Sequence, residues 1–211
     1  GLKICGDTTP LISTRNDKDE KAEYNGHYKE KMYKGGIITD VTTGLPVNYD
    51  CIMGGNDGDG QRLKPFLLDT MQKLAIKFFE WMTWDGAYDS FENFYFVGHV
   101  LKSKLFTKFS TDAAFHEEAT PENIMKKYQK YWAESGFIPP PLGFERVLDF
   151  LAGKGQTELV GKYYRNLQLR ASIENKSEYD RKRCQRSKSE SINGLGKDNV
   201  DFGRLRENGA D

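Results

Sequence analysis

The pattern of apolar and polar positions predicts strands in the first part of the chain. Leu2–Gly6 is mostly apolar and predicts a short strand that ends at Asp7, whereas the polar residues 13–30 predict a loop. Two β-like runs, Met32–Thr39 and Leu45–Cys51, flank a Thr-Gly-Leu-Pro turn. Such a pair of runs around a turn predicts a β-hairpin.

The period then changes to that of helices. After the glycine-rich segment Gly54–Gly60, apolar residues recur every three or four positions across Arg62–Ile76, which predicts an amphipathic helix. The apolar run Phe78–Trp84 predicts a strand that leads directly into a second aspartate. A further amphipathic helix is expected from about Ser90 to Leu101, and a short strand over Lys104–Phe109.

Residues 110–156 lack a simple period, and we expect an insertion or subdomain there. Thr120 followed by Pro121 predicts a capped helix start, and Pro139-Pro140-Pro141 breaks the chain. Gly143–Leu151 predicts one more helix. Beyond the insertion, Thr157–Ser191 predicts one or two basic helices, and the tail from Gly194 to Asp211 is expected to fray.

This order of elements predicts an α/β fold with a mixed sheet flanked by helices. Three antiparallel strands followed by parallel strands with crossover helices resemble the ribonuclease-H-like arrangement. We therefore expect residues 1–109 to form the first part of that core and residues 110–156 an insertion before the last catalytic helix. Residues 157–211 would form its C-terminal basic helical part with a frayed tail.

Composition supports a folded globular chain. The 211 residues are 37% hydrophobic, 13% aromatic and 29% charged, so a core can form in one domain with an insertion. No apolar run reaches the roughly 18 residues of a membrane span, and no signal peptide is recognisable, so we expect a cytoplasmic protein. The chain starts without Met and almost inside a strand, so we expect it to lack upstream sequence.

The charges and thiols narrow the possible chemistry. The three cysteines are far apart and lack the spacing of zinc or redox motifs, so carboxylates must bind any metal. The net charge is zero, but Lys162–Arg206 holds twelve Lys or Arg against six Asp or Glu. This asymmetry fits a basic face for phosphates, and it fits a solvated helix of mixed charge equally well.

Two aspartates, Asp7 and Asp85, follow predicted strands that could be neighbours in the sheet. Carboxylates held close together repel one another unless a divalent cation neutralises them. Mg²⁺ prefers oxygen ligands, and two such ions can activate a nucleophile and stabilise a leaving oxygen in phosphoryl transfer. Taken singly, each aspartate is better explained as an ordinary residue that ends a strand or opens a turn.

Four segments in order resemble insertion-sequence DDE transposases. They are the strand-Asp-Thr start Cys5-Gly6-Asp7-Thr8-Thr9, the hairpin Thr43-Gly44-Leu45-Pro46, the Gly-Asn segment Gly54-Gly55-Asn56 before Asp59, and Trp84-Asp85-Gly86-Ala87-Tyr88-Asp89-Ser90. The last resembles the Asp-x-Gly-Tyr-x-Ser motif with one extra residue. Asp7 and Asp85 take the place of the first two catalytic carboxylates in this resemblance.

The family's third carboxylate lies in a helical Tyr, Arg, Glu, Lys signature, and two sites resemble it. Arg186, Glu190 and Lys197 have the Arg, Glu and Lys spacing, with Arg183 where Tyr is expected. Glu174 is the alternative, with Arg170 before it and Arg181 in place of Lys. Glu190 is the preferred site, and an Arg four residues earlier lies on the same helix face.

The resemblance implies a polynucleotidyl transferase in which Asp7, Asp85 and Glu190 bind two Mg²⁺ or Mn²⁺ ions. It implies cleavage at transposon ends and attack of the freed 3′-hydroxyl on target DNA. Arg181, Arg183, Arg186 and Lys197 would contact phosphates of double-stranded DNA, and a homodimer would join two ends, with no role for a membrane. Two alternatives stay open: an inactive DNA-binding remnant, and a ribonuclease-H-like nuclease without strand transfer.

Overall fold

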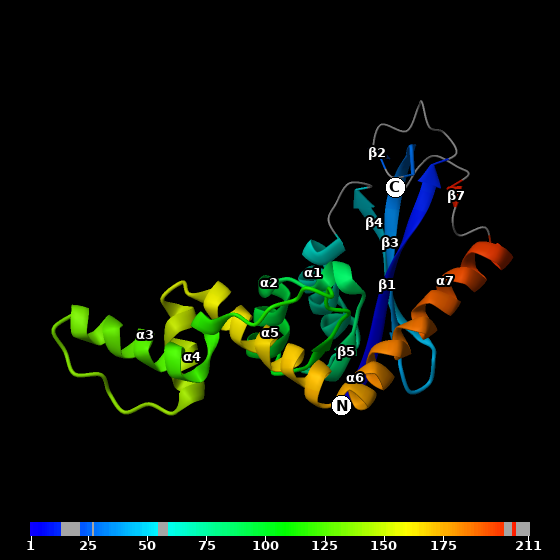
Figure 1. The fold of residues 1–211 in the computed structure, drawn as a ribbon. Helices are drawn as coiled ribbons and strands as arrows, with labels where there is room; N and C mark the ends of the chain where they lie inside the picture. The colour runs from blue at the N-terminus through cyan, green and yellow to red at the C-terminus, as the bar shows by residue number, and fades with distance from the viewer. Residues whose placement is uncertain (14–21, 27, 55–58, 201–203, 206–211) are drawn as a thin grey trace.

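The structure is a computed structural model that describes residues 1–13, 22–26, 28–54, 59–200 and 204–205. The sheet lies at one end of the molecule, and helices α3 and α4 lie at the other (Figure 1). The strands are β1 Leu2–Ser13, β2 Glu23–Asn25, β3 Glu30–Asp40, β4 Pro46–Gly54, β5 Phe79–Thr83, β6 Leu105–Phe106 and β7 Arg204–Leu205. The α-helices are α1 Asp59–Lys73, α2 Phe91–Phe94, α3 Pro121–Glu134, α4 Phe144–Gly153, α5 Thr157–Glu174, α6 Lys176–Arg183 and α7 Ser187–Val200.

The sheet has the mixed topology that the element order predicts. Strand β1 pairs antiparallel with β3, and β3 pairs antiparallel with β4. On its other edge β1 pairs parallel with β5, which pairs parallel with β6. The central order β4-β3-β1-β5-β6 is that of a ribonuclease-H-like fold, so the predicted fold class is confirmed.

Strand β1 is longer than the sequence pattern predicts, and this corrects the expected position of Asp7. The strand runs to Ser13, and its register with β3 extends from Ile4 opposite Asp40 to Ile12 opposite Met32. Asp7 therefore lies in the middle of β1 and not at its end. Strand β1 continues through its polar residues because its backbone is paired with β3. A paired strand needs apolar side chains only at its buried positions.

The predicted hairpin is confirmed, and the side chain of Asp40 holds its turn. The carboxylate of Asp40 accepts hydrogen bonds from the main-chain N–H groups of Thr42 and Thr43, at 3.0 and 3.1 Å. Gly44 adopts a φ of 72°, a conformation that glycine tolerates best. These contacts fix the start of β4 against the end of β3 and so set the hairpin register.

The two faces of the sheet are covered by different helices. On one face Ile4 and Met82 pack with Leu63, Phe66 and other residues of α1 and α2 in the main core. On the other face Cys5 and Trp81 pack with Tyr179 of α6. Successive side chains of a strand point to opposite faces, so Asp7 shares the face of Cys5, and this face is the one that α6 and α7 cover.

Most predicted helices are present, with shifted ends. Helix α1 spans most of the predicted Arg62–Ile76, and the helix expected at 90–101 begins at a Ser90 cap as α2 and continues as a π-helix, Tyr95–Val100. Short 3₁₀ turns cover Gly86–Tyr88, Glu117–Ala119 and Cys184–Arg186. The strand expected over 104–109 is reduced to the two residues of β6.

The helical part beyond β6 has a core of its own. Thr120 caps α3 by accepting from the N–H of Asn123 at 3.3 Å, as the sequence predicts. A second cluster joins α3, α4 and the start of α5, with Ile124, Tyr128 and Leu151 among its buried members. Helix α5 then leads back to the sheet, where Gly161 lies so close to the carbonyl of Phe91 that a Cβ would lie 2.1 Å from that oxygen.

The C-terminal segment corrects a second expectation. Helix α7 continues through Gly194 to Val200, and β7 pairs parallel with the end of β1, so 194–200 and 204–205 are regular structure and not a frayed tail. Packing of α7 against β1 supports the helix despite its glycines, because tertiary contacts override weak helix propensity. Residues 55–58 of the glycine-rich segment, including Asn56, lie outside the described residues.

Candidate active site

Asp7 lies on β1, and Asp85 follows β5, the strand that pairs parallel with β1. Cys5 of β1 is opposite Thr83 of β5 in the parallel pair, and Thr83 is the last residue of β5, so Asp85 lies two residues beyond the paired part of that strand. Neighbouring strands are about 4.8 Å apart, and residues two apart share a face. Thr83 faces α6, because its hydroxyl donates to the Arg183 carbonyl at 3.1 Å, and Asp85 follows it in the loop after β5.

Asp7 is enclosed by two residues from the last helical segments. Arg186 Nη1 lies 3.3 Å from Asp7 Oδ1, and Asn193 Nδ2 donates to Asp7 Oδ2 at 3.0 Å. The Asp7 side chain is only 16% exposed. Burial raises the pKa of Asp7, and the hydrogen bond from Asn193 and the charge of Arg186 only partly offset that effect. The folded protein therefore disfavours the ionised form of the Asp7 carboxyl group.

The guanidinium of Arg186 also contacts Glu190. Its Nη2 lies 2.5 Å from Glu190 Oε1, in the i,i+4 arrangement expected from the sequence. One cation thus lies between the carboxylates of Asp7 and Glu190. Glu190 is 46% exposed, so it borders solvent on the open side of this cluster.

Hydrogen bonds fasten α7 to the sheet beside Asp7. Ser189 is fully buried, and its hydroxyl contacts the carbonyl oxygen of Cys5 at 3.0 Å. Lys188 donates to the carbonyl of Val41, which follows β3. These contacts fix the rotation of α7, and hence the face on which Arg186, Glu190 and Asn193 lie.

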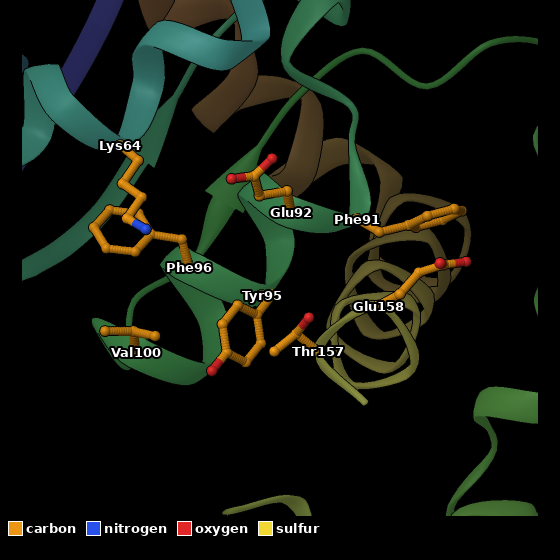
Figure 2. Close-up of a pocket in the computed structure, with 8 residues that line it drawn as sticks. All are labelled: Lys64, Phe91, Glu92, Tyr95, Phe96, Val100, Thr157 and Glu158. Carbon is orange, nitrogen blue, oxygen red and sulfur yellow. The ribbon is translucent and has the colours of Figure 1, made fainter. Parts of the chain in front are cut away.

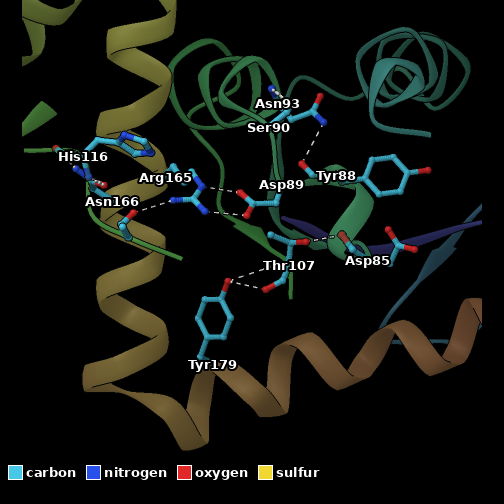
Figure 3. Close-up of polar contacts among 11 residues, drawn as sticks. Asp85, Tyr88, Asp89, Ser90, Asn93, Thr107, His116, Arg165, Asn166 and Tyr179 are labelled. Atoms are coloured by element: carbon cyan, nitrogen blue, oxygen red, sulfur yellow. Dashed lines mark hydrogen bonds and ion pairs between the residues drawn. The ribbon is translucent and has the colours of Figure 1, made fainter. Parts of the chain in front are cut away.

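The loop that carries Asp85 is held by its own network (Figure 3). Asp85 Oδ1 accepts from the N–H of Ala87 at 2.8 Å and so caps a short 3₁₀ turn. The Thr107 hydroxyl donates to the Asp85 carbonyl. Tyr179 of α6 accepts from Thr107 N–H at 3.2 Å and donates to the Thr107 carbonyl at 3.0 Å. Helix α6 is thereby linked through Thr107 to the main chain of Asp85.

A buried ion pair holds the far end of the same loop. Arg165 of α5 makes a bidentate contact with Asp89, at 2.7 and 2.9 Å, and donates to the Ala114 carbonyl at 3.3 Å. Asn93 bridges the loop to α1 by donating to the carbonyls of Tyr88 and Gly60, at 3.1 and 3.0 Å. Bidentate pairs with a guanidinium are strong and directional, so the loop has a defined position between α1 and α5.

The residues at this face fit a divalent cation in donor type. Asp7, Asp85 and Glu190 offer carboxylate oxygens, which Mg²⁺ and Mn²⁺ prefer, and the desolvated Asp7 carboxylate needs a counter-charge. Arg186 provides that charge to Asp7 and Glu190 in this structure. Within the described ranges, no three His, Cys, Asp or Glu side chains are gathered closely enough to hold an ion as they stand.

The other residues singled out from the sequence lie at different places. Glu174, the alternative third carboxylate, is exposed at the end of α5, whereas Glu190 shares Arg186 with Asp7. Arg181 is exposed on α6, and Arg183 pairs with Asp180 at 3.3 Å. Lys197 is on α7, but its side chain lies outside the part of the structure that is described.

The sequence interpretation missed several supporting residues. Asn193 follows Glu190 by three positions, so the helix period alone could have put it on the same face. Tyr179 and Arg165 left no such signal, because their partners Thr107 and Asp89 are 72 and 76 residues away along the chain.

A separate cavity of about 670 Å³ lies on the opposite side, between α1, α2 and the start of α5 (Figure 2). It is lined by Lys64, Phe91, Glu92, Tyr95, Phe96, Val100, Thr157 and Glu158. It shares no residue with the carboxylate face. Its two carboxylates outnumber its one amine, so its charge does not favour an anionic ligand.

The β4-β3-β1-β5-β6 sheet, with helices on both faces, defines a ribonuclease-H-like domain. The sequence profile of the family described as Transposase DDE domain matches residues 2–209. The chain belongs to this family.

Comparison with solved structures shows distant similarity. A solved structure described as the Mos1 transposase paired-end complex with left transposon end shares 12% identity and gives a TM-score of 0.33. The match covers 88% of this chain and 55% of that one, so the chain spans about half the length of that transposase. No curated protein sequence matches the chain. No helix in the described ranges is long and apolar enough to cross a membrane.

Proposed function

We propose that this chain is a catalytically competent DDE transposase domain that cleaves DNA at transposon ends and joins the freed 3′-hydroxyl to target DNA. The proposal rests mainly on the contacts that Arg186 makes with Asp7 and with Glu190. Asp7 lies about 180 positions before the other two residues in the sequence. The fold brings these three side chains together on the α6–α7 face of the sheet, and Asp85 would complete the site from the loop after β5. Carboxylates with perturbed pKa values are concentrated at functional sites, and the raised pKa of the buried Asp7 supports the proposal.

In this proposal Asp7, Asp85 and Glu190 hold the metal ions. When bound, two Mg²⁺ or Mn²⁺ ions would supply Lewis acids for the attacking and leaving oxygens. Asp7 would contribute from the middle of β1, and Asp85 from the loop that follows the adjacent strand β5. Glu190 contributes from α7, which Ser189 fastens to β1. Arg186 neutralises Asp7 and Glu190 until ions bind, and is then able to pair with a DNA phosphate.

The surrounding basic residues are proposed to bind the DNA backbone. Arg181, Arg183, Arg186 and Lys197 would contact phosphates of double-stranded DNA and carry little sequence information. The proposed organisation keeps residues 1–109 and 157–211 as the catalytic core and 110–156 as an insertion. A cytoplasmic protein that joins the nucleoid when bound to DNA, and a homodimer that pairs two ends, complete the proposal.

Strand transfer separates the proposal from its alternatives. A labelled DNA duplex with a recessed 3′-hydroxyl is incubated with a supercoiled plasmid, Mn²⁺ or Mg²⁺ and the chain. A transposase domain joins the label to the plasmid, and Asp85→Asn abolishes the joining. A nuclease nicks the plasmid without joining, and an inactive remnant binds DNA but does neither, so either result would rule out the proposed function.

A further inference from the structure

A groove of about 390 Å³ lies beside the loop that carries Asp85. One side is formed by the segment after β6, residues 107–113, and the other by the end of α5 and by α6. Thr107 lines the groove and donates to the Asp85 carbonyl. Strands β5 and β6 are parallel, and ligands of open α/β sheets bind at the carboxyl ends of such strands. The groove therefore adjoins the carboxylate face at the expected edge.

The lining of the groove is positively charged. Lys108, Lys176 and Arg183 contribute cations, and the one carboxylate, Asp180, is already paired with Arg183 at 3.3 Å. Of the residues that the structure describes, no carboxylate lies within ion-pair distance of Lys108 or Lys176. Two cations without an internal partner favour an anionic occupant.

The polar and apolar parts of the lining indicate which anion fits. The hydroxyl of Ser172 already donates to the Leu169 carbonyl at 2.7 Å, and that of Thr107 to Asp85. These two hydroxyls have no hydrogen left to donate to an anion, so the lysines supply the main attraction for one. Ile173 is 62% exposed and Phe109 is half-buried in the same lining, which gives apolar surface for sugars and bases. A nucleic-acid strand offers both a negatively charged backbone for the lysines and sugars and bases for the apolar surface.

We propose that this groove binds the sugar–phosphate backbone of the DNA that extends away from the cleavage point, with Lys108 and Lys176 as its phosphate contacts. The inference rests on the proposed function because it takes the ligand to be DNA. It goes further by assigning the path of the strand to the β6–α6 side of Asp85. Lys108 stands outside the basic segment 162–206, and only the fold brings it beside Lys176.

The test is the salt dependence of DNA binding in EDTA, where cleavage cannot interfere. Binding of a fluorescent duplex of arbitrary sequence is titrated for the wild type, for Lys108→Ala/Lys176→Ala and for the control Lys126→Ala/Lys127→Ala. The control removes two exposed lysines from α3, at the far end of the molecule. Each lost phosphate contact lowers the slope of log K against log salt by about 0.9, so the groove variant loses about 2 and the control keeps the wild-type slope.

Each outcome has a distinct meaning. Equal slopes for all three proteins would overturn the groove assignment while leaving the proposed catalysis intact. Unchanged DNA binding with altered self-association of the groove variant, measured by sedimentation, would assign the groove to a second copy and overturn the inference as well. A wild type that does not bind DNA would overturn both proposals. A wild type that binds through these lysines but never cleaves would contradict only the catalytic proposal.

Discussion

At the scale of single residues, Asp7 carries a cost that its ligand would relieve. Burial raises its pKa, so the folded state disfavours the ionised carboxylate. Above the folded-state pKa this group lowers stability, and the penalty disappears as the pH falls below the unfolded-state pKa. Binding sites commonly hold such unfavourable groups, because the bound cation, and not the fold, compensates for them.

The first prediction follows from that sign. In metal-free buffer, Asp7→Asn raises the melting temperature near neutral pH, and the difference from the wild type shrinks as the solution is acidified through the folded-state pKa. Added Mn²⁺ stabilises the wild type more than the variant, because the wild type has the Asp7 carboxylate with which to bind the ion and the variant does not. Thermal melts at several pH values measure both effects. A variant less stable than the wild type near neutral pH would contradict this account of Asp7.

Tyr179 gives a second prediction at this scale. Tyr179→Phe removes the hydroxyl that contacts Thr107 and leaves a buried N–H without its acceptor, which costs about 1–3 kcal/mol of unfolding free energy. Because Thr107 supports the Asp85 main chain, we expect DNA cleavage to slow as well.

Tyr128→Phe is the matched control. Its hydroxyl is similarly engaged, donating to the Pro140 carbonyl at 2.9 Å, but it lies in the helical part beyond β6. Chemical denaturation measures the stability of both variants, and a nicking assay measures cleavage. The control loses stability and keeps its cleavage rate. Equal cleavage by the two variants would show that Tyr179 has no positioning role.

At the scale of elements, the sequence predicts what local patterns encode. The hairpin, the α1 period and the Thr120 cap depend on neighbouring residues, and each is present in the structure. The predicted end of β1 was wrong. Asp7, Thr8, Thr9 and Pro10 interrupt the apolar pattern, but the strand continues through them because its backbone pairs with β3. The hydrogen bond that holds α7 against β1 could not be predicted either, since Ser189 and Cys5 are 184 residues apart in the sequence.

Helix α7 carries the prediction that distinguishes the two glutamates. Glu190→Gln should reduce cleavage by more than about 100-fold, the upper end of losses for groups that merely support a metal ligand. Glu174→Gln should leave the rate unchanged, because Glu174 is exposed at the end of α5. Both are exposed glutamates on helices, so both variants should fold, and circular dichroism checks this. The reverse order of effects would move the third carboxylate to α5.

At the scale of the whole molecule, the sheet and the helical part beyond β6 meet at the Asp85 loop. Arg165 joins α5, Asp89 and the Ala114 carbonyl, so a buried guanidinium helps to connect the helices far from the sheet to the candidate site. The family, the ribonuclease-H-like topology and the placement of Asp7 agree with one another, although each derives from a different observation. Catalysis is the claim that unites them.

Nicking of supercoiled plasmid DNA tests that claim most directly. The wild type is incubated with Mg²⁺, with Mn²⁺ and with EDTA, beside Asp85→Asn, and DNA binding is measured in parallel. The account predicts nicking with either ion, none in EDTA, and a loss of more than about 100-fold in the variant with binding retained. A wild type that binds DNA but never nicks it with either ion, or an Asp85→Asn variant that nicks at the wild-type rate, would contradict it.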